Sequence, residues 1–220
     1  TINFSFVETR WEQELAGNPD PIRVLNPIAA PLAVMRSSLM GSLVDALRRN
    51  LAQRIERVRL FELGRVFYRD ASVVAGDASV AGVSQPMRVA GLAFGPIDDI
   101  QWGRAERSVD FFDVKGDLEA LLAPLSVTFQ AAPHPALHPG RSAGVWLEGQ
   151  NIGVVGELHP RWRQRYELPQ APVLFELELA ALLRRPVPAY AELARQQPAR
   201  RDLALVLSDA VYVMSPRPGT

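Results

Sequence analysis

Apolar residues recur at helical spacing in one segment of the chain, which gives the clearest periodic signal in the sequence. Polar residues such as Arg48 and Arg49 fall mostly on the opposite side, so the pattern predicts a long amphipathic helix. A serine hydroxyl at Ser37 or Ser38 can cap its start by accepting a hydrogen bond from a backbone N–H. The helix must pack either on its own core or on another subunit, and its apolar stripe is formed by Leu39, Leu43, Leu47 and Leu51.

Most other apolar segments are short and read as strands, with a few short helical segments between them. No regular strand–helix–strand repeat connects them, so the pattern predicts an α+β fold with a largely antiparallel sheet. Predicted helical segments are Glu8–Leu15, a turn at Ile97–Gly103, Asp113–Leu122 (capped by Asp113), a short helix carrying Trp162 and Tyr166, and Ala180–Leu183. Predicted strands are Ile2–Val7, Ile22–Leu25, Val58–Tyr68, Met87–Phe94, Val127–Ala131, Ser142–Leu147, Ile152–Val155, Val173–Leu179 and Leu203–Leu207.

The segment Val58–Tyr68 is nearly continuously apolar, which is typical of a strand that is buried on both faces. The following residues, Asp70–Gln85, are rich in small residues and are predicted to form an exposed connection.

Composition and charge narrow the class of protein. The chain has 220 residues, of which 48% are hydrophobic and 22% charged, and its formal net charge is zero. This is a globular composition, and a neutral chain is not expected to hold nucleic acid mainly by bulk electrostatics. Cysteine is absent, which excludes disulfides and thiolate metal sites. No apolar run approaches the roughly twenty residues of a membrane span, and no signal peptide is recognisable, so we expect a cytoplasmic protein without membrane contact.

The ends of the chain indicate a piece of a longer protein. The sequence begins without methionine, inside a predicted strand. Near the other end, a proline-rich linker is followed by a single further strand, which cannot fold alone. We therefore expect a main domain over residues 1–190 and, over residues 191–220, a linker with the truncated start of a second domain.

Three groups of residues could carry chemistry, but structural roles explain each of them better. His134 and His138 are four residues apart, yet the prolines beside them oppose a helix, so we expect loop histidines bonded to backbone. Gly153 and Gly156 fit no phosphate-binding motif and suit a hairpin strand. The acids Asp110, Asp113 and Asp117 could bind Mg²⁺, but helix capping and helix-dipole roles account for Asp113 and Asp117.

Arginines offer two further candidate sites. Arg59 could clamp a nucleotide phosphate, but pairing with Glu62 or a neighbouring strand is favoured. The cluster Arg195, Arg200 and Arg201 could contact RNA phosphates or lie on a solvated face. We predict no catalytic, cofactor-binding or metal-binding residue.

The order and spacing of several segments resemble the C-terminal half of bacterial phenylalanyl-tRNA synthetase beta subunits. The resemblance covers about Thr1–Asp209, and the sequence after Asp209 departs from it. The segments that carry it are NPIAAPLAVMRSSLMGSLVDALRRNL, RVRLFELGRVF, RSVDFFDVKGDLEALL, HPALHPGRSAGVWLEGQNIGVVGELHP, VLFELEL and PARRDLALVL.

The resemblance implies a class II aminoacyl-tRNA synthetase-like antiparallel sheet flanked by helices, followed by the first strand of a truncated ferredoxin-like, anticodon-binding domain. It also implies that this region is not catalytic and pairs with the catalytic alpha subunit in an (αβ)₂ heterotetramer, which charges tRNA(Phe) with phenylalanine using ATP and Mg²⁺. Leu39, Leu43, Leu47 and Leu51 would then form a subunit interface, and Arg195, Arg200 and Arg201 would contact RNA.

The residues agree with a non-catalytic module. A class II active site needs an Arg-x-Glu strand, whereas Arg59 and Glu62 are one position too far apart to share a strand face. It also needs a glycine-rich strand that ends in an acid followed by arginine, and in GVVGELHPR the arginine position is Leu158. Two alternatives stay open: a self-sufficient, ATP-binding class II-like enzyme and a free-standing RNA-binding module.

Overall fold

The computed structural model describes residues 1–77 and 79–184. The chain divides into two units, Thr1–Arg185 and Pro186–Thr220, and all of the described residues lie in the first. The predictions made for the second unit, namely the strand Leu203–Leu207, the ferredoxin-like start and the arginine cluster, lie outside the described residues.

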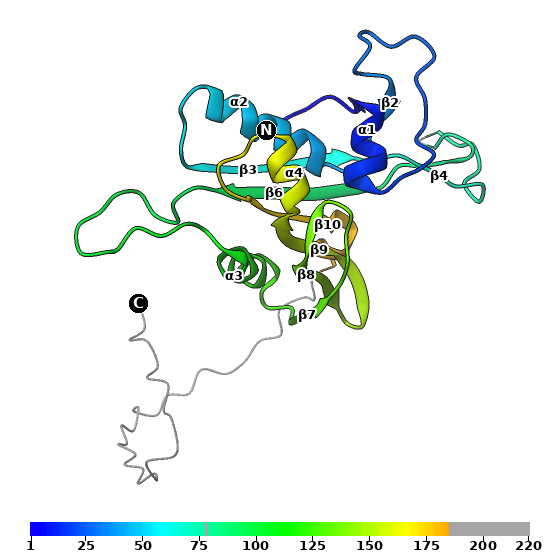
Figure 1. Cartoon of the computed structure of the whole chain (residues 1–220). Helices are drawn as coiled ribbons and strands as arrows, with labels where there is room; N and C mark the ends of the chain where they lie inside the picture. Colours follow the sequence, from blue (N-terminus) through cyan, green and yellow to red (C-terminus); the bar gives the residue numbers. More distant parts are fainter. Residues whose placement is uncertain (78, 185–220) are drawn as a thin grey trace, which may run out of the picture. The chain divides into compact units, whose positions relative to one another are not determined.

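A six-stranded antiparallel sheet is the centre of the fold, which confirms the predicted α+β class (Figure 1). Its last strand in sequence lies in the interior of the sheet, with two strands on one side and three on the other, all from earlier in the chain. The strands, in their order across the sheet, are β3 (Val58–Arg65), β6 (Met87–Phe94), β10 (Val173–Glu178), β9 (Gln150–Leu158), β8 (Leu137–Leu147) and β7 (Val127–Ala131).

Two small two-stranded sheets accompany it. In one, β1 (Phe6–Val7) pairs with β2 (Val34–Met35), and in the other, β4 (Tyr68–Arg69) pairs with β5 (Val83–Ser84). The predicted strand Ile2–Val7 is therefore realised only at its end, and the predicted strand Ile22–Leu25 is reduced to one bridge between Arg23 and Val34.

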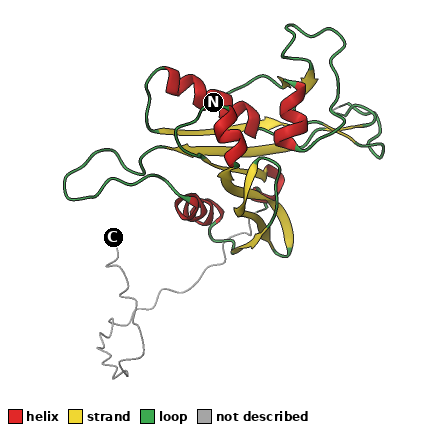
Figure 2. Cartoon of the chain, in the orientation of Figure 1, coloured by secondary structure: helices red, strands yellow, loops and turns green. Residues whose placement is uncertain are grey.

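Helices cover both faces of the main sheet (Figure 2). On one face lie α1 (Thr9–Trp11), the π-helical turn η1 (Glu12–Ala16), α2 (Met40–Ala52) and α4 (Pro160–Arg165) (Figure 1). The opposite face carries α3 (Phe111–Leu122), while α5 (Leu179–Leu182) follows β10 directly. Gly17, at φ 70°, ends η1 in the left-handed conformation that glycine adopts without strain.

Strand alternation divides the interior into two hydrophobic cores. Val58, Leu92 and Leu174 point toward α2, and together they belong to the first core. Their neighbours Ala93 and Val173 point toward α3 and belong to the second core. Each face of the sheet is thus closed by its own helices.

Two further predicted elements differ from the structure. The strand predicted over Val58–Tyr68 is shorter and is not buried on both faces, because β3 is an edge strand on which Phe61 and Leu63 are exposed. The segment Ile97–Gly103, predicted as a helical turn, is part of an irregular loop. The Ile97 N–H donates to the Arg107 carbonyl oxygen across the base of this loop, and no helix forms inside it.

Candidate functional site

The leucine stripe of α2 lies inside the chain's own core, which corrects the prediction of a subunit interface there. Leu39, Leu43 and Leu47 are completely buried, and Leu51 packs against the same core while half-buried. They pack over β3, β6 and β10, whose apolar side chains require a cover of this width. The three buried leucines therefore have no surface to offer a partner.

Arg59 does not pair with Glu62, because alternation along β3 turns them to opposite faces; it bonds to the neighbouring strand instead, which was the other favoured alternative. The Arg59 guanidinium donates to the carbonyl oxygens of Phe94 at 2.6 Å and Pro96 at 2.9 Å, where it fastens the end of the neighbouring strand. Glu62 is buried and accepts hydrogen bonds from Arg36 at 2.8 Å and the Asn3 amide at 2.6 Å. Both side chains are therefore already hydrogen-bonded to other residues of the chain.

Buried carboxylates from three separate elements hold the residues that lead into α2. Glu62 of β3 pairs with Arg36 in an ion pair that is almost fully buried. Glu12 of η1 accepts the Ser37 N–H at 2.8 Å, and Glu176 of β10 accepts the Leu39 N–H at 2.9 Å.

Burial raises the pKa of Glu12 and of Glu176 above the usual carboxyl range, and hydrogen bonds from Ser37 and Ser38, respectively, oppose this shift. Sequence reasoning found the helix but missed these acids, because they lie far from it along the chain.

The three histidines make the same local contact with the backbone. This confirms the predicted role of His134, whereas His138, also predicted in a loop, lies at the start of β8. Each histidine precedes a proline, and its Nδ1 accepts the N–H of the residue two positions later at 3.0–3.2 Å. Burial lowers the pKa of His134 to about 4, so it is neutral at physiological pH. Within residues 1–77 and 79–184 no group of three or more His, Asp or Glu side chains could hold a metal ion.

The predicted acid cluster forms the start of α3. Asp110, and not Asp113, is the cap: its carboxylate accepts the N–H groups of Phe112 and Asp113. Asp113 completes a capping box by accepting the Asp110 N–H at 2.9 Å, and Arg107 holds it by a double hydrogen bond. These contacts confirm a capping role for Asp113, and the helix-dipole role of Asp117 stays a prediction.

Gly153 and Gly156 lie where neighbouring strands approach too closely for a side chain. A Cβ atom on Gly153 would come within 2.1 Å of the Glu176 carbonyl oxygen, and one on Gly156 within 2.8 Å of the Arg141 carbonyl oxygen. This confirms their predicted structural role.

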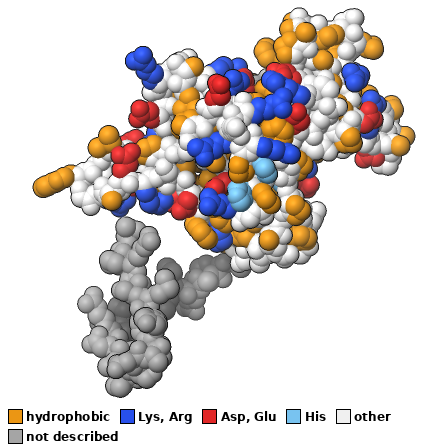
Figure 3. Space-filling view, in the orientation of Figure 1, with side chains coloured by type: hydrophobic (Ala, Val, Ile, Leu, Met, Phe, Trp, Pro, Cys, Tyr) orange, Lys and Arg blue, Asp and Glu red, His pale blue; other side chains and the backbone are white. Residues whose placement is uncertain are grey.

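Large apolar side chains are exposed at several places in the described part of the chain, among them β3 and the loop between β6 and α3. On the outer side of edge strand β3, Phe61 is 63% and Leu63 52% exposed. The loop between β6 and α3 projects from the sheet, with Ile100 and Trp102 almost completely exposed, and hydrophobic side chains mark its tip in Figure 3. Such contiguous apolar exposure is typical of contact surfaces.

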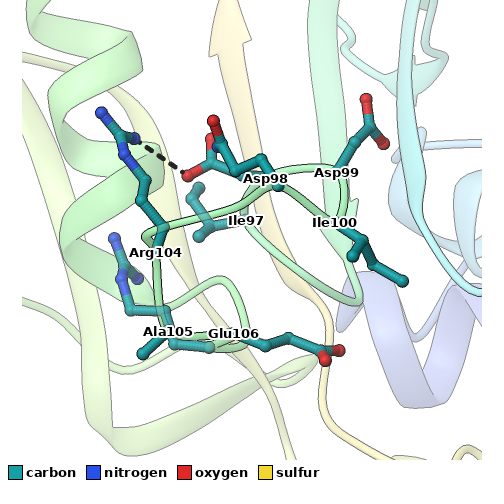
Figure 4. Close-up of a pocket in the computed structure, with 9 residues that line it drawn as sticks. Ile97, Asp98, Asp99, Ile100, Arg104, Ala105 and Glu106 are labelled. Atoms are coloured by element: carbon teal, nitrogen blue, oxygen red, sulfur yellow. Dashed lines mark hydrogen bonds and ion pairs between the residues drawn. The ribbon is translucent and has the colours of Figure 1, made fainter.

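That loop also encloses a small hollow (Figure 4). An Arg104–Asp98 hydrogen bond of 3.1 Å closes one side, while Asp99 and Ile100 point outward. Its volume of about 50 Å³ suits a few water molecules and no larger ligand. The Arg104–Asp98 contact therefore stabilises the loop, and the hollow is too small to be a substrate site.

A larger polar cavity of about 240 Å³ lies beside the start of α2. Its walls come from several elements of the chain, and most of them are polar. The side chains that define it chemically are Ser38, Tyr68, Arg88, His134, Glu176 and Glu178. We refer to it as the polar cavity.

The fold is shared with a known synthetase. A pyrrolysyl-tRNA synthetase from Desulfitobacterium hafniense, PylSc, superposes with a TM-score of 0.56 over 83% of this chain and 60% of its own, at 9% identity. The likeness extends to the fold alone.

Residues 1–179 match the family described as the phenylalanyl tRNA synthetase beta chain CLM domain, and the chain belongs to this family. It is 56% identical to the "Phenylalanine--tRNA ligase beta subunit" of Burkholderia pseudomallei over 215 residues. It is 58% identical to the protein of the same name from Cupriavidus pinatubonensis over 212 residues. These matches cover 98% and 96% of the chain, but the chain spans only about a quarter of the length (26%) of either relative.

No helix in the part of the chain that the structure describes has the length and hydropathy required to cross a membrane.

Proposed function

We propose that this chain is a structural module from the C-terminal half of the beta subunit of a cytoplasmic phenylalanine–tRNA ligase. The module pairs with the catalytic alpha subunit, and the complete (αβ)₂ complex uses ATP and Mg²⁺ to charge tRNA(Phe). Family membership and the 56% identity to a named beta subunit support this assignment.

One observation carries the non-catalytic role. Clamping a nucleotide phosphate on β3 requires an uncommitted guanidinium and a carboxylate on one face of the strand. Here Arg59 fastens the carbonyls that end β6, and Glu62 neutralises Arg36 inside the core. Releasing Glu62 would leave Arg36 as a buried, unpaired charge, which costs several kcal/mol. We infer that β3 serves the architecture of the module and not ATP.

The contact surface with the alpha subunit must lie elsewhere than the buried leucines of α2. We propose the outer side of β3, where Phe61 and Leu63 are exposed although Val89 and Ala93 of the neighbouring strand β6 are buried. Burying two large apolar side chains contributes about 1.5–3 kcal/mol each, which is enough to dominate an interface.

The test mixes this chain with the alpha subunit and follows co-elution by size exclusion. We expect a complex that a Phe61→Asp/Leu63→Asp double variant weakens by about tenfold or more. Val74→Asp, at another strongly exposed apolar residue, is the matched control and leaves binding unchanged. Failure of the unmodified chain to bind would remove the proposed pairing, and equal weakening by both variants would remove the proposed surface.

A calorimetric titration with ATP tests the non-catalytic role separately. We expect no binding heat at millimolar ATP. Saturable ATP binding by the isolated chain would instead favour a self-sufficient nucleotide-using enzyme.

A further inference from the structure

The polar cavity collects groups of both charge signs, and among its charged groups Glu176 also holds the start of α2. Glu176 and Glu178 come from β10 and Arg88 from the neighbouring strand β6. The Arg88 guanidinium lies 3.5 Å from the Glu178 carboxylate, a long and partly open ion pair. Among the described residues, Arg88 Nε has no hydrogen-bond partner.

Glu176 is buried, but only one of its carboxylate oxygens is engaged. Oε2 accepts the Ser38 hydroxyl at 2.7 Å and the Leu39 N–H at 2.9 Å. No hydrogen bond within the described part of the chain reaches Oε1. A ligand that supplies a donor to Oε1 would form a charge-assisted hydrogen bond there.

His134 adds a neutral donor to the same wall. Its Nδ1 accepts the Ala136 N–H at 3.2 Å, which places the ring proton on Nε2. Tyr68, in contrast, donates its hydroxyl to the Ser37 carbonyl and is already satisfied. The cavity therefore offers carboxylate acceptors on one strand, and a guanidinium and an imidazole N–H as donors.

We propose that the polar cavity binds a small zwitterion, a molecule that carries an ammonium group and a carboxylate on a short carbon frame. Its ammonium group bonds to Glu176 and Glu178, and its carboxylate bonds to Arg88 and His134. The ligand is small because about 240 Å³ is below the roughly 300–1,000 Å³ of pockets for drug-sized ligands.

The polar walls give no apolar slot for an aromatic ring, so the ligand differs from the amino acid in the relatives' name. This inference goes beyond the proposed scaffold function and does not depend on it.

Titration of the ¹⁵N-labelled chain with glycine and L-serine, followed by NMR, tests the proposal. We expect saturable shifts centred on the amides of Leu39, Gly153 and Glu176. Acetate and methylammonium, which each carry one half of the zwitterion, are expected to bind at least about tenfold more weakly, because each forgoes charge-assisted hydrogen bonds. L-phenylalanine is expected not to bind. Absence of shifts with glycine and L-serine, or equal affinity for all five compounds, would overturn the proposal.

Variants separate binding in the cavity from binding elsewhere. Glu178→Gln and Arg88→Met are expected to weaken glycine binding about tenfold or more, whereas Glu148→Gln, in the exposed β8–β9 turn, leaves it unchanged. If Arg88→Met shows no cooperative unfolding transition, Glu178→Gln decides alone, since Glu178 is more exposed and its substitution disturbs the fold less. Unchanged glycine affinity in Glu178→Gln would exclude the cavity as the site.

Discussion

The two longest helices begin in opposite ways. At the start of α3, Asp110 and Asp113 lie within one turn of the N–H groups that they accept, and both remain near solvent. At the start of α2, the acceptors of Ser37 and Leu39 are buried carboxylates from η1 and β10. The first arrangement is local and modest in energy. The second joins the helix, the N-terminal segment and the sheet, so it stabilises the tertiary structure and not only the helix.

The largest expected effect comes from the buried ion pair beside α2. Arg36→Met leaves Glu62 in the core without its cation, and we expect a loss of about 3–5 kcal/mol in the free energy of unfolding. Urea denaturation measures this loss. Arg49→Met, which removes an exposed ion pair with Asp45 on α2 itself, is the control and should cost less than about 1 kcal/mol. Similar losses in both variants would mean that the buried acids are no more important than surface charges.

The next effect is the pH dependence that Glu176 adds. Because burial raises the pKa of Glu176 in the folded chain above its unfolded value, the folded state binds this proton more tightly. Its contribution to stability is therefore present at low pH and is lost as the pH rises from the usual carboxyl range, about 4.3, through the folded-state pKa.

Urea denaturation at a series of pH values compares the unmodified chain with Glu176→Gln. As the pH rises, the unfolding free energy of the unmodified chain should fall relative to that of Glu176→Gln. An exposed Glu148→Gln variant corrects for the removed charge. A difference that moves in the other direction would show that hydrogen bonds from Ser38 and Leu39 outweigh burial.

The smallest effect is expected at the local cap. Asp110→Ala removes the acceptor of two N–H groups at the start of α3, which should cost about 1 kcal/mol. Thermal unfolding with Asp110→Asn as the conservative partner measures it, because asparagine caps almost as well. A cost as large as that of Arg36→Met would remove the distinction between the two helix starts.

The same distinction explains what the sequence could predict. The apolar spacing of Leu39, Leu43, Leu47 and Leu51 predicted α2, because that signal lies within the helix. The capping role of the acids before α3 was also predictable, although the cap falls on Asp110. The partner of Glu62 was not, because Arg36 is 26 positions away and only the folded sheet brings them together.

The prediction that β3 is buried on both faces was wrong for a related reason. An apolar run cannot distinguish a central strand from an edge strand with an exposed face, so the pattern predicted Phe61 and Leu63 as core residues. The polar cavity left no sequence signal either, because its side chains come from separate strands and loops, and each is unremarkable alone.

The position of β10 has a consequence for synthesis of the chain on the ribosome. β3 and β6 form one antiparallel pair, β7, β8 and β9 form a second group, and only β10 joins them. Until Val173–Glu178 has been translated, both groups carry an unpaired strand edge that can recruit other chains. Cotranslational folding of this sheet is therefore delayed to its last strand, and a nascent chain that ends before Val173 is the species most in need of a chaperone.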